Sequence, residues 1–226
     1  MRSLHPTFST PFVAVDGGGV FPVHRIYCVG RNYADHALEM GGDPSREAPF
    51  FFSKPADAVI QGHAVPYPPK TADLHHEVEL VLALGTGGSD LSLEEADAAI
   101  YGYAVGVDLT RRDLQAEAKS KGRPWDMAKG FDCSGPIGRI IVRSGDGPAP
   151  HSRIRLSIDG TEKQSGTLAQ MIWSPAEIVA NLSSYVELKP GDLIFSGTPA
   201  GVGPLARGQK VTAEIDGLPR LIFTIK

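Results

Sequence analysis

The chain has 226 residues, and its 22 lysines and arginines against 26 aspartates and glutamates give a formal net charge of −4. This charge gives no electrostatic reason to expect a nucleic acid or an anionic membrane as partner, although local arginines and lysines leave small anionic substrates open. The sequence shows no signal peptide, no apolar stretch long enough to cross a membrane, and no CxxC motif around its two cysteines. We therefore expect a cytoplasmic protein with structural thiols.

Glycine and proline, with 26 and 18 residues, imply many turns and favour a strand-rich fold over a helical bundle. We expect an N-terminal arm, residues 1–23, followed by a single domain, residues 24–226. Residues 24–30 (HRIYCVG) are a compact apolar run that predicts a buried strand. A short helix is expected over residues 31–40 (RNYADHALEM), and a strand edge over residues 51–55 (FFSKP).

His36 and Glu39 lie three residues apart on this short helix, so their side chains can meet. A carboxylate beside an imidazole raises its basicity and fixes its tautomer, which suits the activation of water. Read alone, the pair is more typical of a polar helix surface. Glycines flank the helix on both sides and would permit the hinge motion of a lid.

Residues 75–85 (HHEVELVLALG) form the best strand pattern in the chain, with Glu77 and Glu79 two positions apart. Side chains at i and i+2 of a strand point to the same face. One interpretation is a half-exposed strand with both glutamates in water. The other is a divalent metal site, because two buried carboxylates repel each other unless a cation neutralises them. The same face continues with Val81 and Ala83, which favours the metal site.

A capped helix that begins after Ser92 is predicted to lead into an apolar strand that ends at Asp108. Asp108 is the candidate for a third oxygen ligand, and an all-carboxylate set suits Mg²⁺, Mn²⁺ or Ca²⁺. Its alternative role is to help cap the next helix, for which Thr110 and Asp113 predict a capping box and Ser120 the approximate end. The spacing leaves both roles of Asp108 open.

The helix after Asp108 places Arg112 and Gln115 on one face. The basic residues that follow are more typical of a solvated surface: Lys119, Lys121 and Arg123. Lys129, in DMAKGF, has apolar neighbours and a glycine, and a partly buried lysine near a metal-bound acid would clamp an anion. His75 and His76 are expected to pack beside the site rather than to bind the metal.

The C-terminal half is predicted to consist mostly of strands and turns. Asp159-Gly160 is a strong hairpin signal, a helix is expected over residues 174–186 with Pro175 at its first position, and two last strands flank residues 216–217. The glycine-rich turn over residues 196–203 (SGTPAGVG) lacks the spacing of a nucleotide-binding loop. It is equally consistent with a tight loop and with one that offers Thr198 and backbone groups to a substrate carboxylate.

Six blocks of the sequence resemble the fumarylacetoacetate hydrolase family in content and order: CVGRNYADHALEM, FFSKP, HHEVEL, GYAVGVDLTRRDLQ, KGRPWDMAKGFD and GDLIFSGTPAGVG. The resemblance runs from about residue 24 to the C-terminus. It implies an α+β, strand-rich fold, which is a mixed β-roll or β-sandwich of the type of that family's C-terminal domain, with peripheral helices. It also implies a homodimer.

The resemblance implies roles for residues of this chain. The positions that match the family's metal ligands are Glu77, Glu79 and Asp108, with Mg²⁺ or Mn²⁺ as the expected cation and Ca²⁺ as an alternative. The positions that match catalytic residues are His36, Glu39 and Lys129. The positions that match the substrate pocket are Arg112, Gln115, Gly197 and Thr198.

The activity implied by the resemblance is metal-dependent hydrolysis of the carbon–carbon bond of a 3-acylpyruvate. The expected substrate is fumarylpyruvate, converted to fumarate and pyruvate in gentisate-type degradation of aromatic compounds. Decarboxylation of oxaloacetate, hydrolysis of a short acylpyruvate and isomerisation of a hydroxy-dienedioate stay open, because the same metal chemistry serves them. A non-catalytic binder of metal and dicarboxylate is disfavoured by the set of acid, base and clamp residues. The expected partners are therefore small molecules, not nucleic acid or membrane.

Overall fold

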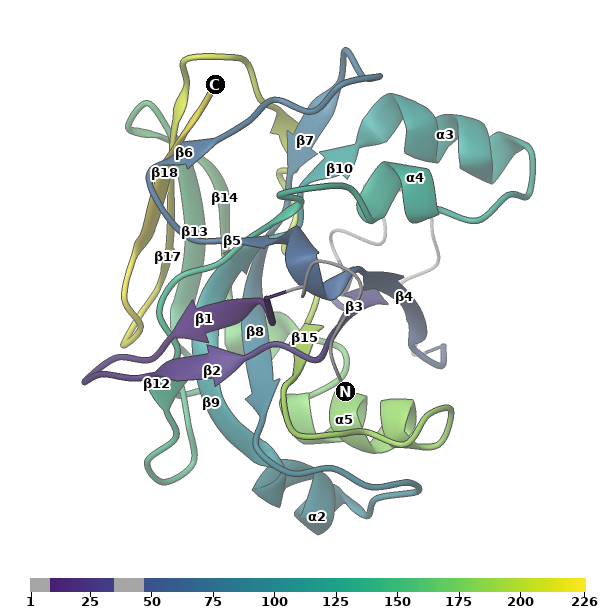
Figure 1. Ribbon diagram of the computed structural model, residues 1–226, viewed down its shortest axis with the longest axis vertical. Helices are drawn as coiled ribbons and strands as arrows, with labels where there is room; N and C mark the ends of the chain where they lie inside the picture. Colours follow the sequence, from purple (N-terminus) through teal and green to yellow (C-terminus); the bar gives the residue numbers. More distant parts are fainter. Residues whose placement is uncertain (1–8, 35–46) are drawn as a thin grey trace, which may run out of the picture.

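The computed structural model describes residues 9–34 and 47–226, and Figure 1 shows its ribbon. Strands dominate the described part, in mixed sheets with helices at the periphery. The strand-rich α+β prediction is thereby confirmed. Most of the predicted short helix over residues 31–40, including His36 and Glu39, lies outside the described residues.

The largest sheet of the described structure has six strands in the order β12-β9-β8-β15-β3-β4. Their bounds are Ile141–Val142 for β12, Ile100–Val107 for β9, Val78–Leu84 for β8, Asp192–Phe195 for β15, Arg25–Gly30 for β3 and Phe50–Lys54 for β4. Neighbours are antiparallel except β15 and β3, which run parallel. The predicted strands over residues 24–30 and 51–55 are therefore confirmed as β3 and β4.

A second sheet has five strands in the order β14-β13-β17-β18-β6. Their bounds are Thr161–Thr167, Arg153–Ile158, Lys210–Ile215, Leu221–Ile225 and Ala64–Val65. Asp159 and Gly160 connect β13 and β14 with φ angles of 50° and 82°. Both angles are in the left-handed region that a two-residue Asp-Gly hairpin turn requires, so this turn was predictable from two letters of sequence.

Strand β8 is buried on both faces, because apolar layers cover the six-stranded sheet on each side. Its residues Leu80, Leu82 and Leu84 belong to the main core, which also contains buried side chains of β13, β17 and β18. Val81 and Ala83 alternate with them and belong to a second core. The absence of a solvated face agrees with the interpretation that favoured a metal site over exposed glutamates.

An N-terminal hairpin covers the second core. It consists of β1 (Phe12–Ala14) and β2 (Val20–Pro22), and it lies over β8 and β9 in Figure 1. Its buried side chains pack with those of β3, β8 and β15: Val13, Val15, Phe21 and Val23. The boundary between an arm and a domain at residue 23 stays a prediction.

Two helices pack against each other at one end of the six-stranded sheet, α2 (Leu93–Ala98) and α5 (Pro175–Ser183). Each begins with a capping box, predicted for Ser92 with Glu95 and additionally found for Ser174 with Glu177, in reciprocal side-chain to backbone hydrogen bonds. Pro175 occupies the first turn of α5 as expected. Two 3-10 turns complete the described helices, η1 (Ala56–Ala58) and η2 (Leu168–Gln170).

The opposite end of the molecule carries a small three-stranded sheet and two helices. The sheet contains β10 (Thr110–Arg111), β7 (Leu74–His76) and β16 (Gly203–Pro204), and the helices are α3 (Arg112–Ser120) and α4 (Asp126–Lys129). A further pair joins β5 (Val59–Ile60) to β11 (Gly135–Pro136). Figure 1 shows α3 and α4 next to β10 and β7, on the side of the sheet edge that ends in β4.

Two predictions made in this region are wrong. Residues 75–85 do not form one strand, because the chain leaves the three-stranded sheet after His76 and enters the six-stranded sheet at Val78. Thr110 does not cap α3, because it lies in β10 and Arg111 precedes the helix without a side-chain cap. Asp113 instead accepts hydrogen bonds from Thr71 and Ala72, which ties α3 to the chain before β7.

Candidate active site

Glu77, Glu79 and Asp108 meet where the chain passes between the three-stranded and the six-stranded sheets. The backbone N–H of Asp108 donates to the Glu77 carbonyl at 2.8 Å, which continues the β8–β9 pairing by one more bond. One carboxylate oxygen of each residue lies within 4.8 Å of the others. All three residues are at most 5% exposed, so three potential negative charges lie close together away from water.

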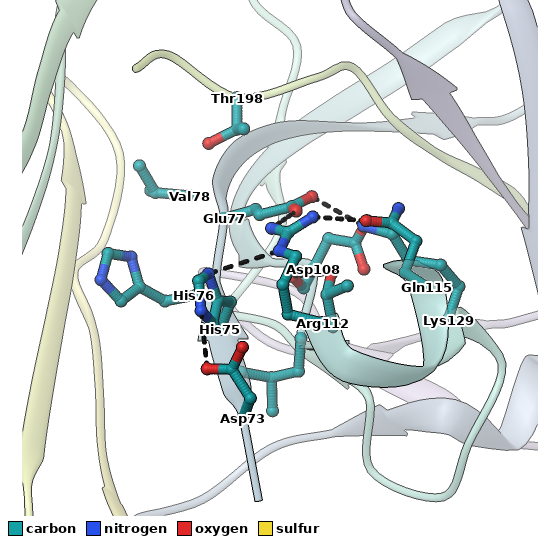
Figure 2. Close-up of polar contacts among 12 residues, drawn as sticks. Asp73, His75, His76, Glu77, Val78, Asp108, Arg112, Gln115, Lys129 and Thr198 are labelled. Carbon is teal, nitrogen blue, oxygen red and sulfur yellow. Dashed lines mark hydrogen bonds and ion pairs between the residues drawn. The ribbon is translucent and has the colours of Figure 1, made fainter. Parts of the chain in front are cut away.

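Two buried lysines contact this carboxylate cluster (Figure 2 shows the contacts of Lys129). Lys129 Nζ donates to Glu77 Oε2 at 2.7 Å and to Asp108 Oδ2 at 2.6 Å. Burial by itself would lower the pKa of Lys129, but the charges of Asp108 and Glu77 outweigh it and raise the pKa. Lys54 Nζ lies 2.8 Å from Asp108 Oδ1. The sequence predicted Lys129 beside an acid, whereas Lys54 was missed because FFSKP indicated only a strand edge.

Glu79 differs from its two neighbours because it makes no ion pair in the described part of the chain. It accepts a hydrogen bond from the backbone N–H of Gly197 at 2.7 Å. Burial, reinforced by the charges of Asp108 and Glu77, raises the pKa of Glu79 well above its ordinary value. A cation held by all three carboxylates would remove this repulsion. The donors are all oxygens, so the cluster fits a hard divalent cation.

Arg112 occupies the first turn of α3 and is fixed by three partners. Its guanidinium forms an ion pair with Glu77, and its Nη1 donates to Gln115 Oε1 at 2.6 Å. Its Nε donates to Nδ1 of His75 at 3.3 Å, and Nε2 of His75 lies 2.9 Å from Asp73 Oδ1. These partners assign a neutral His75 that donates through Nε2. His75 therefore supports Arg112 beside the carboxylate cluster, which agrees with the expectation that it packs beside the site.

Gly197 and Thr198 follow β15 and line the opposite side of the cluster. Gly197 has a φ of 96°, and a Cβ there would lie 2.6 Å from Cβ of Asn32, so only glycine fits where the N–H reaches Glu79. Thr198 Oγ1 accepts from Nε2 of Gln164 at 2.8 Å, and Gln164 Oε1 accepts from Nδ1 of His76 and from the N–H of Val78. Gln164 was missed because its role depends on contacts across the fold.

The pocket that contains Glu77 and Glu79 has a cationic wall and an aromatic wall. The cationic wall comes mainly from α3 and α4, with Arg112, Lys119 and Lys129. The aromatic wall consists of Phe50, Phe52 and Trp125. Lys119 is half-buried here, which corrects the expectation of a solvated lysine. The signal in the sequence that could have placed Lys119 in the pocket is its spacing of seven residues from Arg112. Lys121 and Arg123 are exposed, as expected, and both pair with Glu117.

The structure thus brings together eight of the ten predicted site residues: Glu77, Glu79, Asp108, Arg112, Gln115, Lys129, Gly197 and Thr198. The other two, His36 and Glu39, lie outside the described residues. Within the described ranges, no helix has the length and apolar character needed to cross a membrane.

Comparison with known proteins identifies the family. The family described as fumarylacetoacetate (FAA) hydrolase C-terminal matches residues 25–226. A fumarylpyruvate hydrolase from a Ralstonia species is 43% identical over 190 residues, which are 81% of this chain and 95% of that protein. A mitochondrial oxaloacetate tautomerase from Arabidopsis thaliana is 40% identical over 203 residues, which are 89% of this chain and 91% of that protein.

The fold agrees with the same assignment. The crystal structure of fumarylpyruvate hydrolase from Pseudomonas aeruginosa, in complex with Mn²⁺ and pyruvate, has a TM-score of 0.95 and 48% sequence identity over 99% of both chains. That similarity extends over the two sheets and the helices that surround the carboxylate cluster. The chain therefore belongs to the fumarylacetoacetate hydrolase family and is an enzyme.

Proposed function

We propose that this enzyme is a metal-dependent hydrolase that cleaves the carbon–carbon bond of fumarylpyruvate to give fumarate and pyruvate. The observation that carries the proposal is the buried carboxylate cluster, which opens into a pocket lined by cations. The similarity to a fumarylpyruvate hydrolase that binds Mn²⁺ and pyruvate supports it. The resemblance of the sequence also supports a homodimer that acts in gentisate-type degradation of aromatic compounds, and the two cysteines without a CxxC motif support a cytoplasmic location.

Glu77, Glu79 and Asp108 are the proposed ligands of a divalent cation, for which Mg²⁺ and Mn²⁺ are the candidates. When bound, the cation supplies a Lewis acid that polarises the 2-oxo carboxylate of the substrate and stabilises the charge of the departing pyruvate. Lys54 and Lys129 orient the Asp108 side chain, because each contacts a different oxygen of its carboxylate.

Two residues of the cationic wall, Arg112 and Lys129, perform the electrostatic part of the reaction. Arg112, held by Glu77, Gln115 and His75, binds a carboxylate of the substrate with its fixed guanidinium. Lys129, together with the amide of Gln115, stabilises the oxyanion that develops at the distal carbonyl when the water attacks it. Thr198 and the backbone at Gly197 complete the carboxylate-binding side.

The proton transfer is assigned to His36 and Glu39 on the resemblance alone, since both lie outside the described residues. His36, oriented by Glu39, removes a proton from the attacking water. The water oxygen forms the new bond to the distal carbonyl carbon, and the adjacent carbon–carbon bond breaks. Fumarate leaves with the new oxygen, and the pyruvate enolate takes up a proton at carbon to give pyruvate.

A reaction of oxaloacetate is the second candidate. The oxaloacetate tautomerase of Arabidopsis thaliana is 40% identical to this chain, and oxaloacetate carries the same 2-oxo carboxylate that the carboxylate cluster and Arg112 are proposed to receive. Fumarylpyruvate is preferred because the similarity to fumarylpyruvate hydrolases is higher, at 43% and 48% identity.

The test follows the enol absorbance of fumarylpyruvate after addition of the purified enzyme with Mg²⁺, and again with EDTA. Acetylpyruvate and oxaloacetate are measured in parallel. We expect rapid loss of absorbance that the chelator prevents, with fumarate and pyruvate as products. Turnover of oxaloacetate with no loss of fumarylpyruvate would reject the hydrolase and leave the second candidate.

A further inference from the structure

Helix α3 carries a polar stripe that extends beyond the carboxylate cluster. Arg112, Gln115 and Lys119 are spaced i, i+3 and i+7, which places them on one helix face. All three line the pocket that contains Glu77 and Glu79. Because seven residues of helix rise by about 10 Å, the backbone of Lys119 lies two turns farther along α3 than that of Arg112.

Arg112 and Lys119 differ in their partners. Arg112 forms an ion pair with Glu77. Lys119 has no such carboxylate partner among the described residues, and its Nζ lies 5.2 Å from the centroid of the Trp125 ring. An ammonium held by a ring face keeps its N–H groups available for an anion. Lys119 is therefore a positioned cation whose charge is not neutralised within the described pocket.

The field around Lys119 is positive as well. Burial lowers the pKa of Lys119, the charges of Arg112 and Arg31 lower it further, and the charge of Glu77 opposes them only in part. Arg31 also lines the pocket, with its guanidinium 5.9 Å from the centroid of the Phe50 ring. This end of the pocket is thus suited to an anionic group at a distance from the carboxylate cluster.

Three aromatic side chains form a further wall of the pocket, and their rings are inclined to one another. The Trp125 ring packs edge-on against Phe50 at 5.4 Å between centroids and lies 5.9 Å from Phe52. All three rings line the same pocket. These rings offer apolar contact to the acyl chain of a substrate.

We propose that Lys119 binds the distal carboxylate of the substrate and thereby selects acylpyruvates that carry a second carboxylate at the far end of an extended chain. Fumarylpyruvate has this form, with a carboxylate at each end of seven carbons. Acetylpyruvate lacks the second carboxylate, and in oxaloacetate only two carbons separate it from the first. The inference rests on the proposed function, because it assumes that the 2-oxo carboxylate binds at the carboxylate cluster.

The test compares two stable ligands that differ only in the distal carboxylate, 2-oxoheptanedioate and 2-oxoheptanoate. Their binding in the presence of Mg²⁺ is measured by isothermal titration calorimetry, so the result does not depend on turnover. We expect the wild-type enzyme to bind the diacid about tenfold more tightly than the monoacid. Lys119→Gln should remove this preference and leave the monoacid affinity unchanged, and Lys119→Arg should restore the preference.

Lys121→Gln is the matched control, because Lys121 lies two residues away on the surface and pairs with Glu117. It should retain the preference for the diacid. A wild-type enzyme that binds both acids equally, or neither, overturns the proposal, and so does a Lys119→Gln variant that keeps the preference. A preference that depends on Lys119 in an enzyme that does not hydrolyse fumarylpyruvate would support the carboxylate site and reject the hydrolase.

Discussion

Strand β8 belongs to two buried regions in which burial has opposite consequences. Leu80, Leu82 and Leu84 lie in the apolar core between the two large sheets, where each buried side chain contributes roughly 2 kcal/mol to stability. Glu79, on the same strand, and Glu77, just before it, are as well shielded from water but belong to the carboxylate cluster. Burial of these groups costs stability unless cations compensate it. The fold therefore gains its stability from one region and its chemistry from the other.

The compensation in the carboxylate cluster is uneven. Lys54 and Lys129 contact Asp108, and Arg112 and Lys129 contact Glu77. Glu79 receives a backbone N–H from Gly197 and, among the described residues, no ion pair. The cluster is thus most poorly compensated at Glu79, and a divalent cation would have its largest stabilising effect there.

Glu79→Gln is the substitution with the largest expected effect. The amide keeps the shape of the side chain and still accepts the hydrogen bond from Gly197, but it removes one charge from the cluster. We expect Mn²⁺ to bind at least roughly 100-fold more weakly, which is about 3 kcal/mol, and metal-dependent turnover to be lost. The metal-free variant should be as stable as the wild type or more so, since repulsion within the cluster falls.

Calorimetric titration with Mn²⁺ and unfolding by urea in EDTA measure these two effects. Glu162→Gln on β14 serves as the control, because Glu162 is exposed and outside the pocket. Wild-type affinity for Mn²⁺ in the Glu79→Gln variant would contradict the assignment of Glu79 as a ligand.

Leu82→Ala changes the other region of the same strand. Leu82 is fully buried in the main core, and loss of its side chain leaves a cavity between the sheets. We expect the free energy of unfolding to fall by about 3 kcal/mol, with the affinity for Mn²⁺ unchanged. Urea unfolding measures the loss, with Leu93→Ala as control because Leu93 is 57% exposed on α2. A large loss of metal affinity in Leu82→Ala would show that the two regions are coupled.

The elements that were predictable from sequence depend on local signals. The serine and glutamate pairs at the starts of α2 and α5 fix their caps within one turn, and Asp159-Gly160 fixes its hairpin through two backbone angles. The spacing of two between Glu77 and Glu79 also predicted a carboxylate cluster, because the apolar residues that follow on the same face indicated that the glutamates are not exposed to water. In each case the residues that decide the structure are close together in the chain.

The features that were missed depend on contacts between distant segments. The change of sheet at Glu77 follows from the pairing of β7 with β10 and β16, which no pattern within residues 75–85 reveals. Lys54 reaches Asp108 only because β4 forms the edge of the six-stranded sheet. Lys119 lies in a basic segment that is typical of a solvated helix. Only the docking of α3 over the pocket distinguishes it from Lys121.

Asp113 ties α3, the helix that carries Arg112 and Lys119, to the chain before β7. Its carboxylate accepts from Thr71 Oγ1 at 2.7 Å and from the N–H of Ala72 at 3.0 Å. Burial alone would raise the pKa of Asp113, but these hydrogen bonds lower it below the ordinary 3.8. The stability that the ionised group contributes is therefore present above about pH 4 and is lost as the pH falls through the pKa of the folded state.

Asp113→Asn should cost about 1 kcal/mol of unfolding free energy at pH 7, because the amide replaces one of the two accepting oxygens and removes the charge. The difference from the wild type should shrink as the pH falls below 4. Urea unfolding over a pH series measures it, with Asp146→Asn at an exposed position as the control. A difference that does not change with pH would show that the charge of Asp113 contributes nothing to holding α3.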